Sequence, residues 1–213
     1  MRELFLVIFF LYGFSMQAQI KEFELQSGDL IFQEDCSGNT DNTIKAVTNS
    51  LENYQFTHVG IVYVDDNDSI YVLEAIHPVV SKTPLESYLF PKDKNCVPKS
   101  VVGRLKEIYR PIIPDALLLG LNLMGKAYDD GFILGNDKYY CSEFVYEILL
   151  KANCNQPVFL LNEMTFKSPD TGEITEGWKR YFARFNLPIP EGEPGINPGA
   201  MSRSDAIDIV HIY

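Results

Sequence analysis

Two neighbouring segments of the chain show the residue pattern of β-strands. The segments THVGIVYV (57–64) and SIYVLEAI (69–76) are rich in β-branched and aromatic residues, and DDND separates them. Short runs of this kind joined by a polar turn predict a β-hairpin. Three further strands are expected: one after the turn in SGDLIFQ (27–33), one over 101–105, and one in the alternating AIDIVHIY at 206–213.

Elsewhere the apolar residues recur with the period of an α-helix. This pattern predicts helices within 39–50, 114–128 and 141–152, whereas the tail from residue 155 is expected to be loop-rich, with LPIPEGEPGINPGAMS (187–202) irregular. The apolar positions are Ile44 and Val47 in the first helix, Leu117, Leu118, Leu121, Leu123 and Met124 in the second, and Phe144, Val145, Ile148 and Leu149 in the third.

Length and composition favour one folded domain. The chain has 213 residues, of which 46% are hydrophobic, so it can bury one sizeable core. No repeat or linker divides it, and we expect a single domain over 19–213 of the α+β class. The net charge of -11 disfavours binding to nucleic acid, because an acidic surface repels phosphates.

The first eighteen residues have the composition of a signal peptide. Arg2 precedes the apolar run LFLVIFFLYGF, and small or polar residues follow as far as Ala18. A charged start, an apolar stretch and a small residue predict cleavage before Gln19. No long apolar run follows, so we expect no transmembrane span in the mature chain. The sequence therefore predicts a protein exported to the periplasm or secreted.

Four cysteines occur in the chain: Cys36, Cys96, Cys141 and Cys154. Export permits disulfides, but four cysteines are too few for a scaffold built on disulfides. We expect one disulfide or none, with a free thiol, and leave the pairing open. The cysteines and histidines lack the spacing of a zinc site, so neither a metal nor another cofactor is expected.

Cys141 stands where the third predicted helix begins. A thiol attacks as the thiolate, and an ordinary thiol, with a pKa of about 8.5, provides little thiolate at neutral pH. A helix N-terminus favours negative charge, and its free backbone N–H groups can form an oxyanion hole. Cys141 is therefore the candidate nucleophile; the structural alternative is an inert cysteine that packs the start of the helix.

A general base is sought among three histidines: His58, His77 and His211. His58 lies within a predicted strand, and Gly60, two positions on, is expected to leave room beside its ring. Glu74 lies in the apolar strand VLEAI, where a charge needs a partner, so it is the candidate that orients the imidazole. The two side chains share a face only if the hairpin has an odd-length loop or a β-bulge. Otherwise Glu74 lies on the outer face.

Several segments together resemble a known family. In order they are SGDLIF, FTHVGIVY, VLEAI, GKAYDDGF and YYCSEFVYE, over about 26–152, and PGINPGAMSRS follows in the tail. They resemble the permuted papain-like amidases, the NlpC-related family that includes the YaeF and YiiX proteins. The resemblance implies a circularly permuted papain-like (NlpC-type) fold with an antiparallel sheet packed against helices.

The resemblance also assigns roles to individual residues. His58, Glu74 and Cys141 fall on the base, the orienting residue and the nucleophile of the family. Asp29 and Tyr128 match positions interpreted as structural or pocket-lining. The chain departs from many relatives at 127, where alanine replaces proline.

These features predict an exported cysteine hydrolase that acts through a thioester acyl-enzyme. The expected substrate is a small peptide or amide of the cell-wall type. Two alternatives remain open: a lipid acyl esterase or acyltransferase of the same fold, which an apolar groove beside Cys141 would favour, and a non-catalytic module that binds wall or lipid. The oligomeric state is not predicted.

Overall fold

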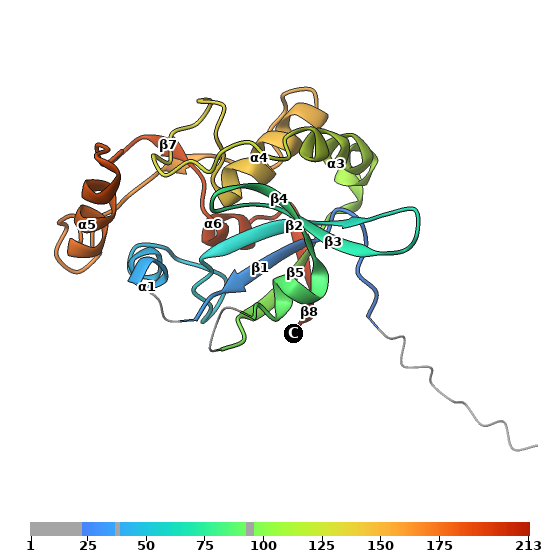
Figure 1. Ribbon diagram of the computed structural model, residues 1–213, viewed down its shortest axis with the longest axis horizontal. Coiled ribbons are helices and arrows are strands. Elements are labelled where there is room, and N and C mark those ends of the chain that lie inside the picture. The colour runs from blue at the N-terminus through green and yellow to red at the C-terminus, as the bar shows by residue number, and fades with distance from the viewer. Residues whose placement is uncertain (1–22, 37–38, 93–95) are drawn as a thin grey trace, which may run out of the picture.

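The core of the protein is a six-stranded antiparallel sheet. The computed structural model describes residues 23–36, 39–92 and 96–213, so the predicted signal peptide lies outside the described part. The sheet has the order β4-β3-β2-β1-β5-β8 (Figure 1). Its strands are β1 (Leu30–Glu34), β2 (His58–Val64), β3 (Ile70–Ile76), β4 (Val79–Pro84), β5 (Lys99–Leu105) and β8 (Ile207–Ile212).

The predicted hairpin is confirmed as β2 and β3. Val64 pairs with Ile70 and Ile61 with Leu73, so the loop comprises residues 65–69 and has an odd length. His58 and Glu74 therefore project from the same face of the sheet, which is the register that the candidate site requires. No β-bulge is needed for this.

Helices cover both faces of the sheet. Helices α3 (Ile113–Asn122) and α4 (Cys141–Ala152) lie side by side over one face (Figure 1). The short helix α2 (Leu85–Leu89) packs on the other face through Tyr88 and Leu89. Alternating strand residues supply the two cores; Val59 and Ile61 face α4, for example, and Val62 faces α2. No helix in the described ranges is long and apolar enough to cross a membrane.

The helix predicted over 114–128 ends at Asn122, earlier than expected. Gly125 adopts a positive φ of 82°, and the chain then runs along the edge strand β4. The amide of Val80 donates to Lys126 O at 2.8 Å, and that of Tyr128 donates to Pro78 O at 3.0 Å. Pairing with a distant strand thus replaces the last helical turn. The first predicted helix is likewise shorter, as α1 (Asn39–Lys45). The 3-10 helix η1 (Glu107–Ile112) directly precedes α3.

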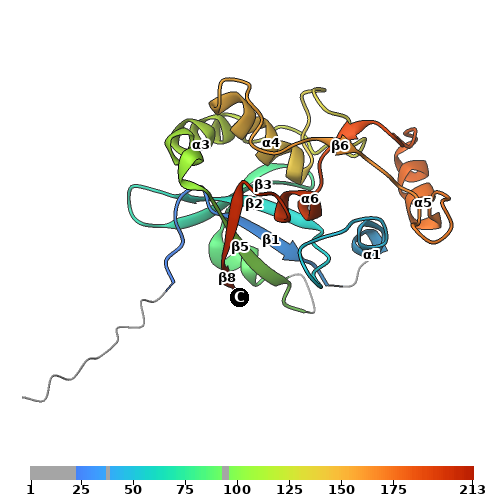
Figure 2. The same cartoon turned by 180° about the vertical axis from the view of Figure 1, so that it is seen from behind.

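The tail is more regular than predicted. It contains α5 (Glu176–Phe185), α6 (Pro198–Ser202) and a two-stranded ribbon of β6 (Asn162–Glu163) and β7 (Pro194–Gly195). Thr175 caps α5 by accepting from the backbone amide of Trp178, and Asn197 caps α6 by accepting from that of Ala200. Helices α1 and α5 lie next to each other beyond the end of the sheet (Figure 2).

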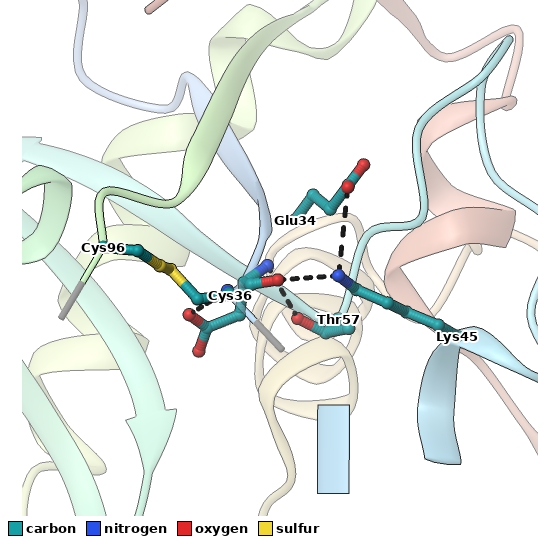
Figure 3. Close-up of a disulfide and its surroundings, with 6 residues drawn as sticks. Glu34, Cys36, Lys45, Thr57 and Cys96 are labelled. Carbon is teal, nitrogen blue, oxygen red and sulfur yellow. Dashed lines mark hydrogen bonds and ion pairs between the residues drawn. A yellow bond between two sulfur atoms is a disulfide. The ribbon is translucent and has the colours of Figure 1, made fainter. Parts of the chain in front are cut away.

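A disulfide joins Cys36, just after β1, to Cys96, just before β5 (Figure 3). The Cα atoms are 6.2 Å apart, and Cys141 and Cys154 are free thiols. The structure thus has one disulfide and two free thiols, where one disulfide or none and a free thiol were expected. Beside it, Lys45 of α1 donates to Asp35 O at 2.7 Å, which attaches α1 to the end of β1.

Candidate active site

Cys141 is the first residue of α4, as the sequence predicts. Its side chain is 6% exposed and lines a cavity. Tyr140 precedes it in an extended conformation, so the chain enters the helix abruptly and leaves the first backbone N–H groups without intrahelical acceptors. Cys141 thus lies where negative charge is favoured.

The helix start is held by Glu143. Its carboxyl group accepts from the backbone amides of Tyr140, at 3.3 Å, and Gly135, at 3.2 Å. Burial raises the pKa of Glu143 to about 8, although the two amide hydrogen bonds act in the opposite direction. At neutral pH the group is therefore mostly neutral, and it adds little negative charge beside Cys141.

His58 and Glu74 form a hydrogen-bonded pair. Nε2 of His58 lies 2.5 Å from Oε2 of Glu74, whose side chain is 3% exposed. Thr83, on β4, donates from its hydroxyl to the other oxygen of Glu74 at 2.5 Å. The carboxylate is therefore held from both sides. Because Nε2 faces Glu74, Nδ1 is the ring nitrogen left to exchange a proton with Cys141.

The environment favours a charged His58 ring. Burial would lower the pKa of His58, but the hydrogen bonds with Cys141 and Glu74, together with the negative charge of both groups, raise it from 6.5 to about 10. The ring is thus an imidazolium at neutral pH, able to pair with a thiolate. The buried ring of Tyr88 lies against it, at 5.9 Å between centroids.

Gly60 has a different neighbour from the one predicted. A Cβ at this position would lie 2.3 Å from Cγ1 of Val72 and 3.3 Å from Cβ of Glu74. The glycine therefore makes room for the strand that carries Glu74, and no atom of the imidazole ring of His58 is among the three atoms nearest to such a Cβ.

The cavity next to Cys141 has a volume of about 410 Å³. Its walls are mainly apolar and aromatic, and they come from α1, α5, the loop before α4 and the ribbon before α6. Lining residues include Ile44, Val47, Phe132, Leu161, Met164, Phe166, Trp178 and Ile196.

Sequence reasoning missed most of this cavity. Helix α5 has a recognisable signal, since Thr175 precedes aromatic residues at helical spacing: Trp178, Tyr181, Phe182 and Phe185. Thr83 carries no signal of its own, because its role depends on the pairing of β3 with β4.

Asp29 and Tyr128 were interpreted as structural or pocket-lining, and the structure gives each of them a different one of these roles. Tyr128 lines the cavity beside Cys141. Asp29 does not line this cavity; its two carboxylate oxygens accept from Arg104 at 2.8 and 2.7 Å.

The other two histidines have partners of their own. His77 pairs with Asp130 at 2.9 Å and His211 stacks on Phe23, so neither joins His58.

Within the described ranges, no group of three or more His, Cys, Asp or Glu side chains is arranged to hold a metal ion. The polar atoms of the site are engaged with one another: Glu74 receives both His58 and Thr83. We therefore derive no step through a metal.

An antiparallel sheet packed against helices, with a cysteine at the start of one helix, is consistent with a papain-like protein, and the family comparison identifies the group. The chain belongs to the permuted papain-like amidases of the YaeF/YiiX type, the C92 family, whose model matches residues 24–211. This confirms the resemblance found in the sequence.

Two relatives are both YiiX proteins of Escherichia coli. The uncharacterised protein YiiX of strain K12 is 30% identical over 128 residues, which cover 60% of this chain and 58% of YiiX. The match thus spans less than two thirds of that relative. The crystal structure of YiiX from strain O157:H7, described as a metalloprotein, has a TM-score of 0.70 at 23% identity and covers 89% of this chain and 98% of YiiX. It shows the shared fold.

Proposed function

We propose that this protein is an exported cysteine amidase with Cys141 as nucleophile, His58 as base and Glu74 as the orienting carboxylate. The family supports an amidase or peptidase type of hydrolase. The observation that carries the proposal is the geometry of the site: Nε2 of His58 lies 2.5 Å from Oε2 of Glu74, and Cys141 is the first residue of α4. The raised pKa of His58, caused in part by hydrogen bonds with Cys141 and Glu74, is in keeping with this arrangement. The order of the three residues along the chain, with the histidine strand before the cysteine helix, also fits a circularly permuted papain-like fold.

The arrangement supports a two-step reaction. The Cys141 sulfur attacks the carbonyl carbon of the amide, and the backbone N–H groups at the start of α4 stabilise the oxyanion. His58 gives its proton to the leaving amine as the C–N bond breaks. Water, deprotonated by His58, then attacks the thioester; the carboxylic acid leaves, and the proton returns to the Cys141–His58 pair.

Glu74 and Thr83 act on the base. Glu74 fixes the tautomer of His58 and stabilises its positive charge, as the third member of a triad does. Thr83 in turn fixes the carboxylate.

The cavity favours a substrate with an apolar group. An aromatic, mostly apolar wall stabilises an acyl chain or a large apolar side chain more than a strongly polar peptide. We therefore propose an amide whose apolar acyl group fills the cavity. The same wall supports the second candidate, a lipid acyl esterase or acyltransferase.

The YiiX structure is described as that of a metalloprotein, but we propose no metal ion at the site of this protein. His58 interacts with both Glu74 and Cys141, and no group of three or more His, Cys, Asp or Glu side chains in the described ranges is arranged to hold a metal ion.

Loss of the thiol tests the proposed chemistry. Cys141→Ala should abolish hydrolysis of acyl amides and esters and leave the melting temperature nearly unchanged. Cys154→Ala, which removes the exposed free thiol, serves as the matched control and should retain activity. Turnover that persists in Cys141→Ala would overturn the assignment, and inactivity of the wild type on both substrate classes would favour a binding module.

Export is proposed from two features. The first eighteen residues have the composition of a signal peptide, and the disulfide Cys36–Cys96 suits an oxidising compartment (Figure 3). Mass spectrometry of the mature protein should find Gln19 as the first residue.

A further inference from the structure

A second cavity adjoins the one that contains Cys141. It has a volume of about 490 Å³, and it shares four lining residues with the first: Leu160, Ile196, Ala200 and Arg203. These four residues form the boundary between the two cavities. A ligand that reaches Cys141 in the first cavity can therefore extend to this boundary.

Arg203 gives the boundary a positive charge. Among the described residues, it is the one cation that lines either cavity. Glu163 lines the first cavity and Asp205 the second, yet neither forms an ion pair with the exposed guanidinium. Arg104 and Arg110 pair with Asp29 and Glu107. Arg180 has no ion pair among the described residues either, but it lines neither cavity. Arg203 thus combines a guanidinium without a carboxylate partner in the described residues with a position at the cavity boundary.

The backbone of Arg203 is fixed relative to the nucleophile. The Ser142 hydroxyl, next to Cys141, donates to Ile196 O at 2.9 Å, and the amide of Ile196 donates to the Tyr140 hydroxyl at 3.3 Å. These bonds attach the segment that leads into α6 to the start of α4. Arg203 directly follows α6, and its amide donates to Ala200 O. The guanidinium is thus carried on a support that is bonded to the catalytic helix.

A purely structural role, at the end of helix α6, explains the position of Arg203 less well than ligand binding does. A basic residue at the end of a helix interacts favourably with the last carbonyl groups. Helix α6 has only 5 residues, so this interaction is small. An interaction with the end of the helix also does not explain why Arg203 lines both cavities.

We propose that Arg203 binds the carboxylate of the substrate, which is an N-acyl amino acid. The inference rests on the proposed function: the acyl chain occupies the apolar cavity beside Cys141, and the carboxylate of the leaving amino acid reaches the guanidinium. A guanidinium matches a carboxylate through two parallel hydrogen bonds. Apolar walls with one unpaired cation at their edge complement an amphiphile with a single negative charge.

Binding to the inactive Cys141→Ala protein tests this inference without turnover. The probes are N-decanoylglycine and its methyl ester, which differ in the negative charge. Isothermal titration calorimetry should show that the acid binds about 2- to 5-fold more tightly than the ester, as expected for a carboxylate paired with an exposed guanidinium. In Cys141→Ala with Arg203→Met the two dissociation constants should become similar. Arg180→Met changes another exposed arginine that has no ion pair among the described residues and lies outside both cavities. It is the matched control and should keep the preference.

The outcomes separate the two proposals. Equal affinities for acid and ester in Cys141→Ala, no binding of the acid, or a preference that survives Arg203→Met would each overturn the role of Arg203. Tighter binding of decyl phosphate than of the acid would also overturn it, in favour of a phosphate-bearing lipid. If the acid preference depends on Arg203 but the wild type hydrolyses neither probe, the proposed amidase activity fails while the binding site stands. If Cys141 hydrolyses the probes but the acid binds no more tightly than the ester, the proposed amidase activity stands while the role of Arg203 fails.

Discussion

At the scale of single residues, the site depends on how the Glu74 carboxylate is held. One of its oxygens receives His58 and the other receives the Thr83 hydroxyl. A nearly buried carboxylate without donors would be costly and could turn away from the imidazole. In the proposed mechanism Thr83 is therefore a positioning residue, which would act on Cys141 through Glu74 and His58.

Replacing Thr83 separates this role from packing. Thr83→Val keeps the shape and leaves one oxygen of Glu74 without its donor, so kcat should fall by about 10-fold, equivalent to one hydrogen bond to a charged group. Thr83→Ser restores the hydroxyl and should recover most of the activity. Steady-state kinetics on the same acyl amide checks this, and a Thr83→Val enzyme with normal kcat would contradict it.

At the scale of elements, the cavity wall depends on close contact between α1 and α5. Gly177, near the start of α5, leaves no room for a side chain: a Cβ there would lie 2.2 Å from Oγ1 of Thr43 and 3.0 Å from its Cγ2. Thr43 is on α1, beside Ile44 of the cavity wall. The glycine therefore sets the distance between two helices that contribute to the wall of the cavity.

Gly177→Ala should therefore destabilise the protein. Alanine in a helix normally gains up to about 1 kcal/mol over glycine, but the overlap with Thr43 should cost about 1–3 kcal/mol and outweigh it. Thermal unfolding should show a lower melting temperature. Adding Thr43→Ala should recover part of the loss in a double-mutant cycle; a Gly177→Ala protein as stable as the wild type would contradict the packing argument.

The elements that could be predicted from the sequence are those that local pattern determines. The β2–β3 hairpin and α4 were predicted because alternation and an amphipathic stripe define them within a few turns of chain. Helix α5 has such a stripe but was not predicted, because the neighbouring prolines and glycines favoured a loop-rich tail.

Other features depend on contacts between distant segments. Residues 125–128 leave the helix because β4 offers backbone partners. Thr83 reaches Glu74 through strand pairing, and Cys36 meets Cys96 across a sequence separation of 60 residues. The triad residues could be proposed from the sequence because each lies in a well-defined element, whereas the cavity is made of loops and helix ends whose meeting no local pattern encodes.

At the scale of the whole molecule, two raised pKa values contribute to the dependence of stability on pH. The pKa of His58 is raised from 6.5 to about 10, and that of Glu143 from 4.5 to about 8. A raised pKa in the folded state stabilises fully below the unfolded value, and this stabilisation is lost as the pH rises through the folded value. For both groups, therefore, the stability of the folded protein decreases as the pH rises.

The melting temperature should fall as the pH rises from about 6.5 to about 10, the interval between the two pKa values of His58. His58→Gln should flatten the curve in this interval, and Glu143→Gln should flatten it between about 4.5 and 8. Thermal unfolding followed by circular dichroism at a series of pH values checks both. A melting temperature that rises over the upper interval in the wild type would contradict the ion pair at the site.

The most direct measurement is competitive alkylation of the two free thiols. Cys141 is 6% exposed, whereas Cys154 is exposed, so access alone favours Cys154. With limiting iodoacetamide at pH 6, and mass spectrometry of each adduct, the Cys141–His58 ion pair predicts faster labelling of Cys141, and His58→Gln should abolish this advantage. Faster labelling of Cys154 in the wild type, or equal labelling of Cys141 with and without His58, would contradict the central claim.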